Sequence, residues 1–186
     1  MQGYNGADPK NGSTQAQNSG GVDTGGLGSL ASLNGGTTQV AVFSSSQSSN
    51  TQDDIASSVR EFNSVNPDGK VVLVGHSLGA DNLVEMVNSN KDLKVNTLIT
   101  LDIADHYDDD NIPGNVANAK NYYQTNDFPG GEKIEVDDPS KTTGQNILAP
   151  NSTHRSIDND LKDTVKTDVL KSIEQPVLTI PAPKKN

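Results

Sequence analysis

The feature that most constrains the fold is a run of aliphatic residues that meets a glycine-flanked serine. Residues 71–74 are Val-Val-Leu-Val, and residues 75–79 are Gly-His-Ser-Leu-Gly. This pattern is typical of a nucleophile elbow, in which a buried strand turns sharply into a helix. Such a turn strains the backbone of Ser77 and leaves room only for small residues at positions 75 and 79. The residues that follow carry an apolar stripe at helical spacing: Leu83, Val84, Met86 and Val87.

Strand and helix patterns alternate along the chain. Helical periodicity predicts one helix from about Asp53, capped by Thr51 or Asp53, to just before Pro67, a second from the elbow to about Asn88, and a third from about Asp158. This alternation is typical of an α/β fold with a mostly parallel central sheet and helices on both faces. Short apolar runs predict the strands, at residues 38–43, 71–74, 95–101 and 119–124.

The length of the chain fits a single domain over residues 1–186. A chain of 186 residues is long enough for one sizeable core and too short for two. Residues 1–37 are rich in Gly, Ser and Asn. This composition indicates either a linker or disordered segment, or a long active-site loop followed by a short helix near 27–33. We assign the core to residues 38–175 and a C-terminal tail to residues 176–186.

Charge and cysteine content narrow the classes of partner and site. The net charge is −10 at pH 7, which opposes binding to nucleic acid, and we expect no nucleic-acid partner. The chain has no cysteine, which excludes disulfides, a thiol nucleophile and cysteine-based zinc sites. The acidic run Asp108–Asp110 lacks the alternating ligands and central glycine of a calcium loop, so we expect neither a metal nor a cofactor.

Hydropathy predicts no transmembrane segment, because no stretch approaches the roughly 18 apolar residues of a membrane helix. The start of the chain lacks the charged and apolar regions of a signal peptide. Met1 stands before residues that resemble the end of a strand, which favours a domain excised from a longer protein. The compartment stays open.

The serine of the elbow needs two partners to act as a nucleophile. An imidazole must accept the proton of the hydroxyl, and a carboxylate must orient that imidazole. Of the three histidines, His76 lies inside the turn and is expected to support it by packing, and His106 lies in an acidic loop. The predicted base is His154, which precedes the last helix and completes the chain order Ser, Asp, His that suits this architecture.

Two carboxylates are candidates for the orienting acid. Asp102 directly follows the strand 95–101, 25 residues after Ser77, which places it at the carboxyl end of the neighbouring strand. Asp127 follows the next strand and suits the geometry too. We prefer Asp102 and keep Asp127 as the alternative.

An acyl-transfer site also needs N–H donors that face the developing oxyanion. The N–H of Leu78, at the start of the helix, is the predicted first donor. No clear His-Gly or Gly-Gly loop follows the first strand to supply a second donor, and the nearest candidates are Gly6 and Ala7. One such donor is worth on the order of 10²–10³ in rate, so its absence would slow catalysis.

These motifs resemble the serine lipase/esterase branch of the α/β-hydrolase superfamily over about residues 38–175. The similar parts are the Gly-His-Ser-Leu-Gly turn, the Thr-Leu-Asp sequence that ends in Asp102, and a histidine before a terminal amphipathic helix. Pancreatic-type lipases carry the acid on a strand similar to that of Asp102, whereas small bacterial lipases carry it one strand later, nearer to Asp127. Residues 115–124 and 153–160 further resemble hydrolase domains of bacterial secreted multidomain proteins, including toxin-like effectors.

The resemblance implies a minimal α/β-hydrolase that cleaves carboxylic esters through an acyl-serine intermediate, without a cofactor. Ser77 would be the nucleophile, His154 the base, Asp102 the orienting acid, and Leu78 part of the oxyanion hole. The substrate would be a small acyl ester or a lipid. Two alternatives stay open: a non-catalytic hydrolase fold that serves as a binding module, and a toxin-like lipase effector with a neutralising protein partner.

Overall fold

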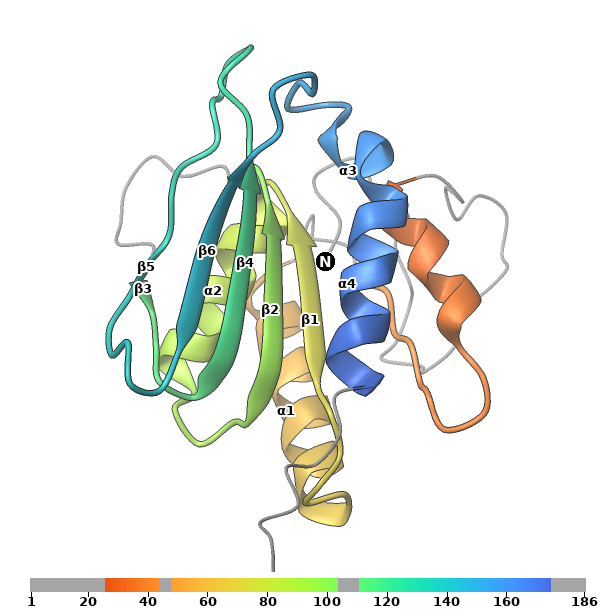
Figure 1. Cartoon of the computed structure of the whole chain (residues 1–186). Coiled ribbons are helices and arrows are strands. Elements are labelled where there is room, and N and C mark those ends of the chain that lie inside the picture. The colour runs from red at the N-terminus through yellow and green to blue at the C-terminus, as the bar shows by residue number, and fades with distance from the viewer. Residues whose placement is uncertain (1–25, 44–47, 104–110, 175–186) are drawn as a thin grey trace, which may run out of the picture.

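A four-stranded parallel sheet forms the centre of the structure (Figure 1). The structure, a computed structural model, describes residues 26–43, 48–103 and 111–174. The spatial order β1-β2-β4-β6 follows the chain order, so each strand lies beside the next one along the sheet. The prediction of an α/β fold with a mostly parallel central sheet is confirmed. The central strands are β1 (Val72–His76), β2 (Val95–Leu101), β4 (Val116–Tyr123) and β6 (Thr143–Leu148), and a separate parallel pair comprises β3 (Asn111–Ile112) and β5 (Glu135–Val136).

Helices cover both faces of this sheet (Figure 1). Successive side chains of a strand point to opposite faces, so each strand serves two cores. Leu73 and Leu98 pack with α1 and α2, whereas Val72 and Ile99 pack with η1 and α4. Burial on both faces explains why β1 begins with three aliphatic residues and why β2 carries apolar residues on both of its faces. The helices are η1 (Gly26–Leu33), α1 (Ser48–Val65), α2 (Leu78–Ser89), α3 (Ile157–Asp160) and α4 (Lys162–Glu174).

Helix α1 carries the predicted apolar stripe but begins earlier than predicted. Ile55 and Val59 are buried, and Phe62 packs against the same core. The helix begins at Ser48, so the prediction of a start near Asp53 is wrong. Residues 48–51, which precede Asp53, are Ser, Ser, Asn and Thr, all good helix caps. The sequence pattern therefore does not distinguish among several starting points.

The strand predicted at residues 38–43 is not a strand. Within the described part of the chain, Thr38 pairs only with Gly35, across a tight turn. The N–H of Val40 donates to the side-chain oxygen of Asn34 at 3.2 Å, and the side chains of the segment stay at least partly exposed. None of the described strands pairs with this segment, and an apolar run without a partner strand forms no ladder.

The remaining predicted elements exist, with shifts at their ends. The strand predicted at 95–101 is β2, and the strand predicted at 71–74 is β1. The strand predicted at 119–124 is β4, which begins three residues earlier at Val116. The short helix predicted near residues 27–33 is the 3₁₀ helix η1.

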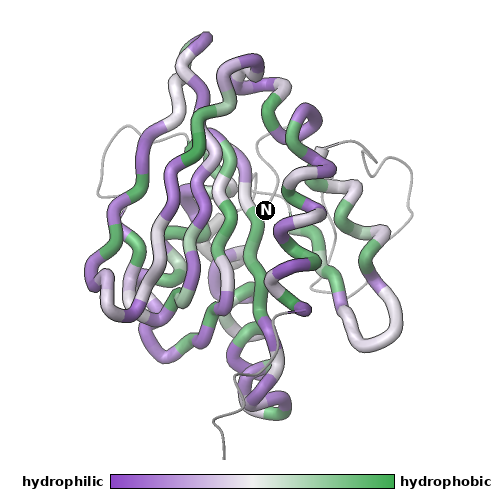
Figure 2. Tube along the Cα trace, in the orientation of Figure 1, coloured by the Kyte–Doolittle hydropathy of each residue, from purple (hydrophilic) through white to green (hydrophobic). Residues whose placement is uncertain are grey.

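The predicted last helix is divided into α3 and α4 at Leu161. Its predicted apolar face is present, since Val165 and Val169 are buried in the core that η1 shares. Strand β6 has no counterpart among the predicted strands. Figure 2 shows the reason: β1 is largely apolar, whereas the outer strand β6 is more hydrophilic.

Several sequence predictions concern residues outside the described part of the chain. They include the character of residues 1–25, the strand end at Met1 and the tail at 176–186. The other residues in this group are Gly6, Ala7, His106 and Asp108–Asp110. The assignment of residues 1–186 to a single domain likewise stays a prediction.

Candidate active site

The glycine-flanked serine lies at the carboxyl end of β1, in the turn that leads into α2. Ser77 has φ 54° and ψ −134°, a conformation that residues other than glycine rarely adopt. Its N–H donates to the carbonyl of Leu101 at the end of the neighbouring strand (2.9 Å). A Cβ atom on Gly75 would lie 2.7 Å from the Cα of Ala80, so a side chain at this position would collide with the start of α2. The strained, closely packed turn expected from the sequence is therefore present.

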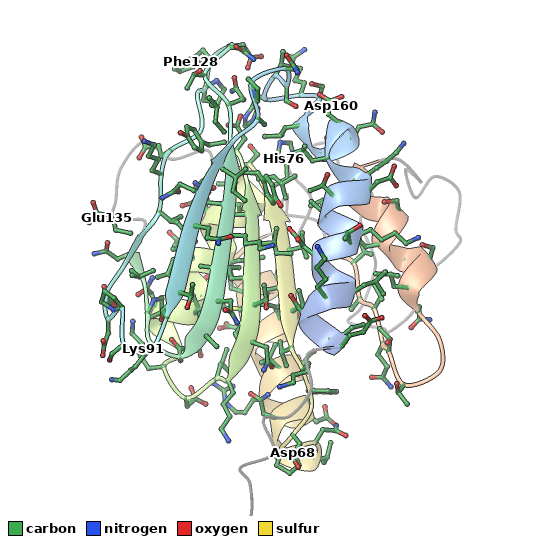
Figure 3. All side chains as sticks on the ribbon, viewed as in Figure 1. Asp68, His76, Lys91, Phe128, Glu135 and Asp160 are labelled. Carbon is green, nitrogen blue, oxygen red and sulfur yellow. The ribbon has the colours of Figure 1, made fainter. Side chains whose placement is uncertain are left out.

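Ser77, His154 and Asp102 form one continuous hydrogen-bonded chain. The Oγ of Ser77 lies 2.9 Å from the Nε2 of His154, and the Nδ1 of His154 lies 2.7 Å from the Oδ2 of Asp102. The three residues follow the carboxyl ends of β1, β6 and β2, respectively. Figure 3 labels His76, next to the serine, near the same end of the molecule as Phe128 and opposite Asp68. The structure thus brings together the three residues selected from the sequence.

Burial differs sharply along this chain of side chains. The side chain of Asp102 is fully buried, whereas that of His154 is 16% exposed. Asp102 also has φ 45°, a left-handed conformation that aspartate tolerates better than most residues. A buried carboxylate on Nδ1 selects the tautomer whose Nε2 can accept a proton from the serine hydroxyl. This arrangement can therefore generate a nucleophilic serine.

The alternative acid, Asp127, contacts the backbone of the base and not its ring. The Oδ1 of Asp127 accepts the N–H of His154 at 2.8 Å. Of the two candidates, only Asp102 reaches the imidazole among the hydrogen bonds of the described residues. Asp127 instead anchors the loop that carries His154.

The predicted oxyanion donor stands at the start of α2. Because Leu78 is the first residue of this helix, its N–H has no intrahelical acceptor and lies at the positive end of the helix dipole. The N–H is adjacent in sequence to the serine that would carry the acyl group. No position is assigned to a second donor, because Gly6 and Ala7 lie outside the described residues.

His76 has a contact that the sequence did not indicate. It was expected to support the turn by packing, but its Nε2 also donates to the carbonyl oxygen of His154 (2.9 Å), and the two rings lie 5.2 Å apart. Burial lowers the pKa of His76, and the nearby carboxylate of Asp158 partly opposes this shift. A partly buried histidine therefore holds the backbone of the residue that carries the base. The only signal in the sequence was its position beside the serine.

Titration of His76 is expected to make stability depend on pH. Folding lowers its pKa below the ordinary 6.5, so the unfolded chain binds more protons here as the pH falls through the mildly acidic range. Its contribution to stability is complete above the unfolded pKa and declines below it. The His76→Gln variant keeps a side-chain N–H donor but does not titrate. As the pH is lowered from about 7.5 to about 5.5, the unfolding free energy of this variant should therefore rise relative to that of the wild type, as measured by urea unfolding. A pH-independent difference would contradict this prediction.

Across 26–43, 48–103 and 111–174, no helix is long and apolar enough to cross a bilayer. The same ranges hold no cluster of three or more His, Asp or Glu side chains suited to a metal ion.

No protein-family model matches the sequence, and no curated protein matches it. What the site can do is therefore inferred from its own residues.

Proposed function

We propose that this chain is a serine-dependent carboxylic-ester hydrolase that acts through an acyl intermediate on Ser77. The observation that carries the proposal is the unbroken chain of hydrogen bonds from Ser77 through His154 to Asp102. Its three members have the chemistry that acyl transfer needs: a nucleophile, a base and a group that orients the base.

In the proposed reaction, the Oγ of Ser77 attacks the acyl carbon while Nε2 of His154 takes its proton. The N–H of Leu78 donates to the oxyanion of the tetrahedral intermediate. His154 then gives the proton to the departing alkoxide, which leaves an acyl-serine and an alcohol. Water attacks the acyl-serine by the reverse sequence of proton transfers, and the products are a carboxylic acid and free Ser77. Asp102 holds Nδ1 throughout.

The backbone of Ser77 supports catalysis over a purely structural or binding role. A non-glycine residue in such a conformation costs on the order of 1–3 kcal/mol. Glycine would relieve this strain in a turn that only had to connect β1 to α2. A serine is explained when its hydroxyl must be held against an imidazole, as it is here.

Exposed apolar side chains near the site support an acyl substrate. Leu78 is 41% exposed and follows Ser77 directly. Phe128 and Leu148 are also exposed, and they lie just after β4 and at the end of β6. These positions are all at the carboxyl edge of the sheet, where substrates of parallel α/β sheets bind. We therefore propose a small acyl ester or a lipid as the substrate.

A fluorophosphonate probe tests the proposal directly. An activated Ser77 should attack its phosphorus and displace fluoride, giving one label per chain that intact-mass spectrometry counts and peptide mapping locates. His154→Ala should suppress labelling. Ser58→Ala removes a serine of α1 and should label like the wild type. Folded wild-type protein that does not label at Ser77 would overturn the proposal and would favour a non-catalytic binding module.

A further inference from the structure

Gln124 is a fully buried glutamine directly after β4, at the edge of the sheet that carries the site. Glutamine is rarely buried, because an amide removed from water costs free energy unless its donors and acceptors find partners. Its backbone and side-chain amide groups all have partners, and these partners are parts of the site or of the loops that hold it.

The N–H donors of Gln124 hold the acid. Its backbone N–H donates to Oδ1 of Asp102 (3.1 Å), and its Nε2 donates to Oδ2 of the same carboxylate (2.9 Å). That Oδ2 also faces Nδ1 of His154 at 2.7 Å. Because one residue contacts both oxygens, the plane of the carboxylate is fixed with respect to the imidazole.

The side-chain oxygen of Gln124 holds the loop that carries the base. Its Oε1 accepts the backbone N–H groups of Asn126 (2.6 Å) and Asp127 (3.0 Å). Asp127 in turn accepts the N–H of His154 at 2.8 Å. The Nδ2 of Asn126 adds two bonds of 2.8 Å to backbone oxygens of the same loop, those of Pro150 and Ser152.

The turn that Gln124 organises also covers the acid. The Nε2 of Gln124 donates to the carbonyl of Pro129 (3.0 Å), and the backbone carbonyl of Gln124 accepts the N–H of Gly131 (3.1 Å). Gly131 lies so close to Asp102 that any side chain at this position would collide with the carboxylate. The turn over residues 124–131 therefore lies directly on Asp102, which has no exposed surface.

We infer that Gln124 is a positioning residue, a single buried amide that sets the acid and the base relative to each other. Its N–H groups donate to Asp102 and so position the acid. Its Oε1 accepts the N–H groups of Asn126 and Asp127 and so positions the loop of the base. Its role in turnover rests on the proposed function. Its role in geometry can be measured without turnover.

The first test replaces Gln124 with methionine, which has similar length and no amide. Misplacement of a catalytic pair by about 1 Å can cost on the order of 100-fold, so Gln124→Met should lower kcat for a p-nitrophenyl ester by about 10- to 100-fold. KM should change by less than about twofold, because no contact with substrate is removed. A kcat like that of the wild type would overturn the inference.

A second variant separates positioning from a general loss of stability. Gln124→Glu places a carboxyl beside Asp102, and two carboxylates this close resist being charged together. At low pH the introduced carboxyl is protonated and can still donate to Asp102. At high pH the introduced carboxylate repels the carboxylate of Asp102. The activity relative to wild type should therefore fall as the pH rises from about 6 to about 9. A ratio that does not change with pH would contradict positioning through Asp102.

Thr142→Val is the matched control. The hydroxyl of Thr142 is buried and donates to the carbonyl oxygens of Pro113 (3.3 Å) and Val116 (2.8 Å), at the opposite end of β4. Its loss removes buried hydrogen bonds without touching the site. We expect this variant to lose stability and to keep the kcat of the wild type. An equal loss of kcat in Thr142→Val would mean that stability alone explains the Gln124 variants.

A proton NMR measurement tests the inference even if the chain is not a hydrolase. The Nδ1–H of His154 should give a downfield signal through its bond to Asp102, assigned by its absence in His154→Ala. In Gln124→Met this signal should move upfield or broaden, and in Thr142→Val it should stay unchanged. An unchanged signal in Gln124→Met would overturn the inference. Failure of wild-type labelling would overturn only the proposed hydrolase activity.

Discussion

Replacing Ser77 with alanine is expected to lower kcat/KM for p-nitrophenyl esters by about 10⁴-fold or more. Without the Oγ atom no acyl-enzyme can form, and the remaining donors offer only weak stabilisation of attack by water. The change removes a single oxygen, so the protein should fold as before. Initial rates over a range of ester chain lengths, combined with circular dichroism, check both parts. Activity near that of the wild type would exclude Ser77 from the reaction.

The Ser77→Gly variant serves as a control for backbone strain. It should be as inactive as Ser77→Ala, because both lack the nucleophile. Glycine accepts the φ of 54° without strain, whereas alanine does not. The strain of about 1–3 kcal/mol exceeds the entropic cost of glycine, about 0.5–1 kcal/mol, so Ser77→Gly should be the more stable variant by about 1 kcal/mol. Equal unfolding free energies would mean that the turn relaxes when the serine is removed.

The part of the site that borders the sheet could be predicted from the sequence. Ser77 was identified because an apolar strand, flanking glycines and a helical stripe coincide within a few residues. Asp102 followed from its place after a second apolar strand, since carboxyl ends of adjacent parallel strands meet at one edge. His154 was chosen by elimination among three histidines and by chain order. These inferences use local patterns together with a single topological rule.

The supporting contacts could not be predicted because they join segments with no common pattern. Gln124 is an ordinary polar residue at the end of a strand, and nothing local indicates that it is buried against Asp102. Asp168 is a similar case, because it is one of several polar residues of α4 and yet is buried. Its carboxylate accepts hydrogen bonds from Lys120 (2.6 Å) and Tyr122 (2.5 Å) of β4. Burial of such residues depends on tertiary packing, which periodicity does not describe.

Strand β6 shows the same limit for the fold. Its side chains are mostly exposed, so its burial does not require an apolar pattern. It is held by backbone pairing with β4 and by the side chain of Asn146, which bonds to both the N–H and the carbonyl of Ile134 (2.9 Å each). The converse case is residues 38–43, an apolar run with which none of the described strands pairs. Pairing, and not composition, decides both cases.

The choice between the two acids gives the second large effect that we expect. Asp102→Asn keeps the shape of the side chain but removes the charge that orients the imidazole, which should lower kcat by about 10⁴-fold. Asp127→Asn keeps a side-chain oxygen for the N–H of His154, so it should lower kcat by less than about 10-fold.

The same substitution at the two positions separates the function of the acid from support of the loop. Both variants lose one negative charge at the same edge of the sheet, so a general electrostatic effect would lower kcat similarly in both. Only Asp102 contacts Nδ1 of His154 among the described hydrogen bonds, so only its variant should favour the wrong imidazole tautomer. Rates of fluorophosphonate labelling provide the same comparison without dependence on the leaving group. A large loss in Asp127→Asn and a small loss in Asp102→Asn would transfer the role of the acid to Asp127 and require the loop that carries His154 to rearrange in solution.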